Sequence, residues 1–175
     1  RRHVQMGPPV ELYARPQAKL EPRADHDTST PQVQEALLAD ARSGRYLFWW
    51  FGFPCTGFCS WNKVNGGTRT KAAPEGDPHG PPWELESTAH ATFAAKLFTE
   101  VADNKGMPTA ENPAPDGRYP AAFELRCWRK ILARPDVLIV PLDMCPYNLG
   151  PPPDQGGSQE GPQTTFHRKR TWLVT

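Results

Sequence analysis

Two polar side chains stand where a strand is expected to end, and both are of types that take part in covalent chemistry. Cys55 follows the apolar run 46–51. Backbone N–H groups at a strand end can favour the thiolate, which is the nucleophilic form of cysteine. Glu111 is the single acid in the segment 107–113, where a second strand is expected to end. Taken one at a time, Cys55 can equally be a buried structural cysteine, and Glu111 a solvated loop carboxylate.

The elements that must position these residues follow from hydrophobic spacing. Helices are expected at about 31–43, 87–104 and 121–133, and strands at 46–51, 107–111, 137–140 and 171–174. Thr30 and Pro31 suit the start of the first helix and Gly44 its end. The unbroken apolar run 46–51 is typical of a strand buried on both faces. This alternation predicts an α/β sheet, in which ligands bind at the carboxyl ends of the strands.

Two stretches, 60–86 and 150–161, hold too many glycines and prolines for regular structure. Loops of such length either cover a site or are disordered, and the first of them leaves directly after Cys55. Residues 1–30 are polar and rich in proline, with one short strand possible at 10–13. We therefore divide the chain into a poorly defined segment, 1–30, and a domain, 31–175.

Composition excludes several classes of protein. The 175 residues carry 20 Lys and Arg against 19 Asp and Glu, so the net charge of +1 gives no global field for a polyanion. The basic run 167–170 is either a solvated patch or a phosphate contact. No apolar window is long enough to cross a membrane and no secretory signal is present, which predicts an intracellular protein. Position 1 is not Met, which suggests a fragment.

A small zinc site is a further hypothesis. Cys55 and Cys59 are four residues apart. The other candidate ligands are His79, His90, Cys127 and Cys145. These four are scattered singly, whereas structural zinc sites use paired short spacings, so the pattern does not favour zinc.

Read together, four short segments resemble motifs of the cytosine-C5 DNA methyltransferases. FPCTGFCS at 53–60 resembles the Pro-Cys loop of that family, and ENP at 111–113 its Glu-Asn-Val motif. DMCPY at 143–147 resembles a Cys-x-Tyr segment of a divergent branch from phages and protist mobile elements. FHRKRTWLV at 166–174 resembles the family's Arg-x-Arg segment entering a strand. The resemblance covers about 31–175 and implies an incomplete Rossmann-like methyltransferase sheet with helices on both faces.

The resemblance also implies roles for individual residues. Cys55 would add to C6 of a cytosine flipped out of the base stack, so that C5 can attack the methyl group of S-adenosylmethionine. Glu111 would hydrogen-bond the exocyclic amine and ring N3, and Arg168 or Arg170 would hold the base or a phosphate. The stretch 60–86 would be a closing loop. The substrate contacts implied by the same motifs are Pro54, Thr56, Phe58, Asn112 and Pro113.

The chain departs from the family pattern in several places. Cys59 stands where the family has Ser, and Pro113 where it has Val. The segment 10–14 faintly resembles the strand before the cofactor turn, but the glycines of that turn are replaced by Arg-Pro-Gln at 15–17. We therefore expect a partial domain that is inactive alone, acting on DNA or alternatively RNA, in the nucleus if the organism is eukaryotic. The alternative is a noncatalytic, methylase-derived module that binds nucleic acid by charge.

Overall fold

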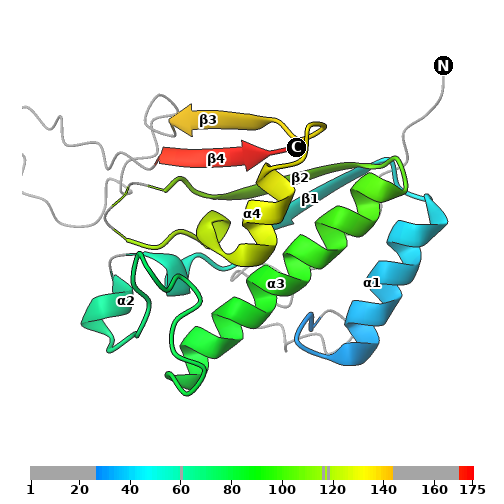
Figure 1. Cartoon of the computed structure of the whole chain (residues 1–175). Helices are drawn as coiled ribbons and strands as arrows, with labels where there is room; N and C mark the ends of the chain where they lie inside the picture. Colours follow the sequence, from blue (N-terminus) through cyan, green and yellow to red (C-terminus); the bar gives the residue numbers. More distant parts are fainter. Residues whose placement is uncertain (1–26, 60, 116, 118, 144–169) are drawn as a thin grey trace, which may run out of the picture.

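The protein forms a small α/β fold in which four helices pack on a four-stranded mixed sheet (Figure 1). The computed structural model describes residues 27–59, 61–115, 117, 119–143 and 170–175. The strands are β1 (Phe48–Gly52), β2 (Met107–Pro113), β3 (Ile139–Asp143) and β4 (Arg170–Val174). The helices are α1 (Pro31–Ser43), α2 (Trp61–Val64), α3 (Pro82–Asp103) and α4 (Arg126–Leu132), with 3-10 turns η2 (Thr56–Phe58) and η3 (Ala122–Glu124).

The strand order β1-β2-β4-β3 brings strand ends that are far apart in the sequence together at one end of the sheet. β1 and β2 are parallel and are joined by α3, with Gly52 opposite Glu111. β4 runs antiparallel to both β2 and β3. The carboxyl ends of β1, β2 and β3 and the start of β4 therefore lie together, at the left of Figure 1.

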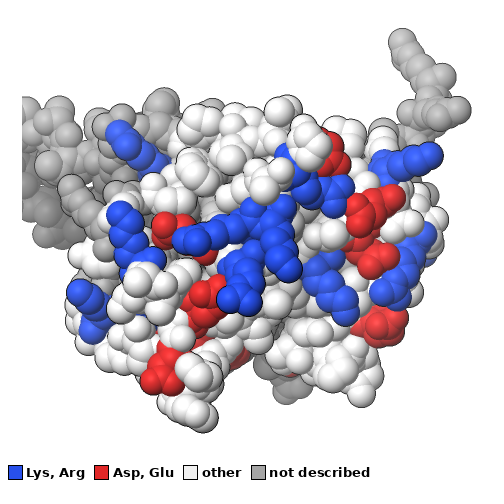
Figure 2. Space-filling view, in the orientation of Figure 1, with Lys and Arg blue, Asp and Glu red and all other residues white. Residues whose placement is uncertain are grey.

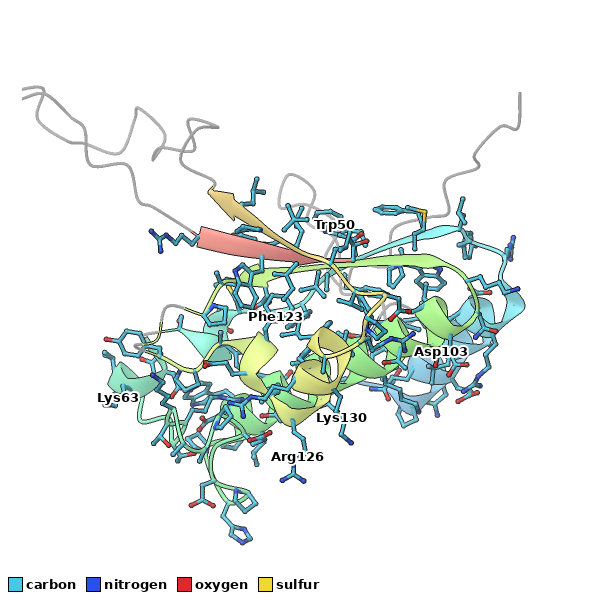
Figure 3. All side chains as sticks on the ribbon, turned by 45° about the horizontal axis from the view of Figure 1, so that its top comes forward. Trp50, Lys63, Asp103, Phe123, Arg126 and Lys130 are labelled. Atoms are coloured by element: carbon cyan, nitrogen blue, oxygen red, sulfur yellow. The ribbon has the colours of Figure 1, made fainter. Side chains whose placement is uncertain are left out.

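In the part of the chain that the structure describes, helices cover one face of the sheet and not both (Figures 1 and 3). Trp49 and Phe51 point to the helices, whereas Phe48 and Trp50 are 53% and 56% exposed. The expectation that 46–51 is buried on both faces is therefore wrong, because the side chains that β1 presents on its second face are more than half exposed. The strand register puts further exposed apolar residues on this bare face, namely Met107, Leu138 and Val140.

The core lies between the sheet and α3. Phe98, Phe123 and Trp128 pack their rings together. The ring centroid of Phe98 lies 5.6 Å, and that of Phe123 5.2 Å, from the Trp128 centroid. The indole N–H of Trp128 donates to the carbonyl of Ala91 at 3.0 Å, so α4 is also hydrogen-bonded to α3. Phe53 stacks on Trp128 at 5.3 Å, which anchors the chain just beyond β1 to the same core.

Several boundaries follow from the sequence. The first helix is confirmed at Pro31–Ser43, and it ends because Gly44 takes the left-handed conformation (φ 62°) that glycine adopts without strain. The last strand is confirmed, beginning one residue earlier than expected, at Arg170. Among the described residues, no helix is both long and apolar enough to cross a membrane. The possible strand at 10–13 and the loop 150–161 lie outside the described residues.

Other boundaries differ from expectation for local reasons. α3 begins at Pro82 rather than near 87, since proline lacks the N–H that the first helical position leaves unpaired anyway. The single helix expected at 121–133 is broken into η3 and α4. The break lies at Leu125, whose backbone is extended (ψ 147°). β3 lies at Ile139–Asp143, two residues later than expected, so 137–138 precede it.

The two tryptophans Trp128 and Trp50 predict opposite effects of the same substitution. Trp128→Ala should lower the free energy of unfolding by about 3–5 kcal/mol, because it empties the centre of the core. Trp50→Ala, on the bare face, should change it by less than about 1 kcal/mol. Urea denaturation followed by circular dichroism measures both. Equal losses would mean that the bare face is covered in solution.

Candidate functional site

The backbone positions of the residues singled out for chemistry lie at the end of the sheet where β1 and β2 end. Glu111 is paired with Gly52, and Cys55 lies three residues beyond that glycine. At the start of β4, the carbonyl of Arg170 accepts a hydrogen bond from Ala114 N–H at 3.0 Å. Cys55, Glu111 and Arg170 therefore lie at one end of the sheet, although more than 100 residues of sequence separate the first from the last. The register puts the Glu111 side chain on the face of Trp50 and that of Arg170 on the opposite face, with Trp172. Arg168 lies outside the described residues.

Cys55 sits on a tight turn directly after the strand. Its carbonyl accepts the N–H of Phe58 at 2.9 Å, which closes the turn η2. The Cys55 side chain is half-buried, and its neighbours Pro54 and Thr56 are exposed. Cys59 is also half-buried, and its thiol donates to the Thr56 carbonyl at 3.3 Å. The two cysteines thus have similar exposure and differ in hydrogen bonding.

Asn112 joins the two motifs physically. It is 1% exposed, and its Nδ2 donates to the carbonyl of Phe53 at 3.0 Å, two residues before Cys55. Its Oδ1 is buried without a hydrogen-bond partner in the described part of the chain, as is Oγ1 of Thr171. On either side of Asn112, Glu111 and Pro113 are half-buried. Asn112 therefore fixes the end of β2 to the backbone that leads into the Pro-Cys turn.

Phe58 holds the other end of this turn in the protein interior. Its ring is 3% exposed, and the Arg69 guanidinium lies 4.1 Å from the ring centroid. Gly57 packs so closely on α3 that a Cβ there would lie 2.5 Å from the Cβ of Ser87, so a larger residue does not fit. In this structure Phe58 packs beneath Arg69, and any contact of Phe58 with substrate stays a prediction.

Arg69 is held by a buried ion pair with Glu84. Both side chains are fully buried, and Arg69 Nε lies 3.1 Å from Glu84 Oε1. The guanidinium also donates to the carbonyls of Pro74 (2.6 Å) and Glu84 (2.9 Å) and to the hydroxyl of Thr88 (2.7 Å). A buried charge is tolerated only with such pairing and hydrogen bonding.

The Glu84 carboxylate gathers the segment that follows the turn. It accepts hydrogen bonds from the N–H groups of Thr68 (2.8 Å) and Arg69 (3.0 Å), from the Thr68 hydroxyl (3.0 Å) and from Asn62 (3.2 Å). Burial by itself raises the pKa of Glu84, but these hydrogen bonds and the charge of Arg69 outweigh it, so the pKa lies below the usual range. The carboxylate is therefore ionised in the folded protein near neutral pH.

The stretch 60–86 was expected to lack regular structure, and that expectation is wrong in part. It contains α2 and the first residues of α3. Its described residues are fastened to α3 by Glu84 and Arg69. Sequence reasoning missed both residues, because each is a single charge in a polar, proline-rich stretch with no periodic pattern to indicate burial. The proposed movement of this stretch as a closing loop stays a prediction.

The structure also bears on metal and cofactor sites. Over the described ranges, no three His, Cys, Asp or Glu side chains gather to hold a metal ion, and Cys145 lies outside those ranges. S-adenosylmethionine, which the resemblance implies, needs glycines that leave space for the cofactor. Here the space beside Gly57, Gly67 and Gly76 is filled by side chains of this chain. Those three glycines offer the cofactor no space, whereas Gly44, Gly66 and Gly117 have no neighbouring atoms beside them. The turn that the resemblance would require falls at 15–17, outside the described residues, so the cofactor stays a prediction.

Comparison with protein-family models, with curated proteins and with solved structures finds no match to this chain. The likeness to cytosine-C5 methyltransferases consequently depends on the four short motifs and on where the structure puts those that it describes.

Replacing Glu84 tests the buried ion pair. Glu84→Gln should lower the free energy of unfolding at pH 7 by about 3–5 kcal/mol, since Arg69 is left buried without its counter-charge. Because the pKa of Glu84 is depressed on folding, its contribution is present above the unfolded pKa of about 4.3 and is lost as the pH falls through the lower folded value. As the pH falls below about 4.3, the free energy of unfolding of the variant should therefore decrease less than that of wild type.

Glu86→Gln is the matched control, because Glu86 is an exposed glutamate on the same helix. It should change stability by no more than about 0.5 kcal/mol. Urea titrations at several pH values measure all three proteins. Equal effects of the two substitutions would show that Glu84 is not a buried partner of Arg69.

Asn112→Ala should lower the free energy of unfolding by about 1–3 kcal/mol, because it leaves the Phe53 carbonyl without its donor. Asn65→Ala, at an exposed asparagine, serves as the control and should cost less than about 0.5 kcal/mol. Thermal and urea unfolding provide the comparison. A loss confined to Asn65→Ala would contradict the assigned hydrogen bond.

Proposed function

We propose that this chain is part of a cytosine-C5 DNA methyltransferase-like domain that binds and activates cytosine. Cys55 is the nucleophile, Glu111 orients the base, and Arg170, with Arg168, supports the base or a phosphate. The observation that carries the proposal is the placement of Cys55 and Glu111 beyond and at the carboxyl ends of two adjacent parallel strands, with the backbone of Arg170 at the same end of the sheet. The carboxyl ends of parallel strands are where open α/β sheets bind their ligands.

The chemistry that these groups would perform begins with the Cys55 thiolate. Its sulfur forms a bond to C6 of the cytosine ring, and the electron pair of the C5–C6 double bond moves into the ring toward C5 and N3. The Glu111 carboxyl group, hydrogen-bonded to N3 and the exocyclic amine, stabilises this electron-rich ring. Reversal of the same step expels the thiolate and restores cytosine. In this proposal the chain's own residues bind the base and activate it covalently.

The fit of Asn112 supports this assignment. Since its amide holds the Phe53 carbonyl, the backbone leading to Cys55 is tied to the residue next to Glu111. The backbone before the nucleophile is thus fixed to the strand that carries the base-orienting acid. A reaction between two fixed groups requires such an arrangement. The Rossmann-like sheet implied by the resemblance belongs to the same proposal, and the parallel pair β1 and β2 joined by α3 supports it.

The proposal leaves the methyl donor outside the described residues. The segment where the resemblance would require the cofactor turn, 15–17, is not among them. The proposed role of the described part is consequently limited to the base. DNA is the proposed substrate, with RNA as the alternative.

The test uses a substrate that traps the first step without a methyl donor. In DNA containing 5-azacytosine, nitrogen at ring position 5 makes C6 more electrophilic and takes up a proton after the sulfur adds. Wild-type protein should form a complex that resists detergent, seen as a shift on a denaturing gel. Cys55→Ser should abolish it and Cys59→Ser should retain it. Glu111→Gln should slow its formation by at least about 100-fold.

An adduct that survives in Cys55→Ser, or that disappears equally in Cys59→Ser, would overturn the assignment of the nucleophile. Absence of any adduct, together with DNA binding that Cys55→Ser and Glu111→Gln leave unchanged, would instead favour the noncatalytic module. Circular dichroism of each variant confirms that its fold is retained.

A further inference from the structure

A groove between α3 and α4 lies on the side of the helices that faces away from the sheet. It has a volume of about 530 Å³. The residues that line it are Glu75, Thr88, Thr92, Leu125, Arg126, Cys127 and Lys130. In Figure 3 the Arg126 and Lys130 side chains point from α4 into solvent, away from the sheet. Neither belongs to any of the motifs that mark the strand ends.

Basic side chains gather around this groove. Figure 2 shows Lys and Arg concentrated over α4 and the adjoining part of α3. Arg126, Arg129 and Lys130 on α4 and Lys96 on α3 are all exposed. Within the described ranges none of the four forms an ion pair, whereas Arg42 and Arg134 are each paired with two carboxylates. The charge is therefore concentrated locally in a chain whose net charge is only +1.

The other lining residues offset this charge only in part, since they include one carboxylate against the two cations Arg126 and Lys130. Burial raises the pKa of the Cys127 thiol, although hydrogen bonds with Thr92 and the backbone oppose the effect, so the thiol is neutral. Thr88 is fixed in place by Arg69, whose guanidinium donates to its hydroxyl at 2.7 Å. Glu75 is the one carboxylate among the described lining residues, and it accepts the backbone N–H of Arg126 at 2.8 Å.

We propose that this basic groove binds the phosphate backbone of a nucleic acid. Arg, Lys and threonine hydroxyls are the groups that contact phosphate oxygens, and such contacts carry no sequence information. The choice of nucleic acid over another polyanion rests on the proposed function at Cys55. The groove gives the nucleic acid a second, sequence-independent contact on the helical layer, separate from the end of the sheet where the base would react.

Fluorescence anisotropy of a labelled mixed-sequence DNA duplex tests the proposal, with salt varied between about 50 and 200 mM. Arg126→Glu/Lys130→Glu should weaken binding at least about tenfold and reduce the salt slope by about 2, one for each lost phosphate contact. Lys63→Glu/Lys71→Glu changes the net charge equally at exposed lysines outside the groove and should stay within about twofold of wild type. Arg126→Gln/Lys130→Gln, with circular dichroism, separates lost contacts from misfolding.

Equal weakening by both double reversals would overturn the proposal, because binding would then follow overall charge. Displacement of the duplex by poly-glutamate as readily as by unlabelled DNA would also overturn it, in favour of an acidic polypeptide. The proposed function is tested by a different measurement, the adduct at Cys55 on denaturing gels, so the two proposals can fail independently. Loss of the adduct with retained groove-dependent binding would contradict only the reaction.

Discussion

The carboxylate of Glu84 is the point on which the segment after Cys55 depends. A polar stretch of this kind buries little apolar surface, so it has little to offset the conformational entropy lost on ordering. Here one ionised side chain accepts hydrogen bonds from backbone and side-chain donors of three residues, one of which, Arg69, is also its ion-pair partner. Arg69, held by that carboxylate, in turn covers Phe58. The geometry at Cys55 is thereby linked to a charge in the first turn of α3.

Local signals predict local structure well in this chain. Pro31 and Gly44 mark the limits of α1 because proline and glycine have restricted roles at helix ends. Hydrophobic spacing also predicts the existence of the strands, although not that Phe48 and Trp50 are exposed. The break at Leu125 was not predictable from spacing, since the turn before it is closed by a side-chain hydrogen bond, from the Ala121 N–H to Glu124 at 2.7 Å, which apolar periodicity does not record.

The same distinction between local signals and long-range contacts applies to the candidate site. Motif order and expected strand ends placed Cys55 and Glu111 at one end of the sheet, and the parallel register agrees with that prediction. The contacts that fix the site join residues far apart in sequence, such as Asn112 with Phe53. The basic groove likewise depends on how α3 packs against α4. Pairings of this kind leave no periodic or compositional trace in one sequence.

The bare face of the sheet provides the protein with an internal optical probe. The Trp50 side chain is 56% exposed, whereas Trp128 is fully buried in the core. An indole that moves from water into an apolar contact emits at shorter wavelength and becomes harder to quench with a soluble collisional reagent. Whatever settles on the open side of the sheet, a further part of the polypeptide or another molecule, will therefore change the emission of Trp50 while that of Trp128 stays constant.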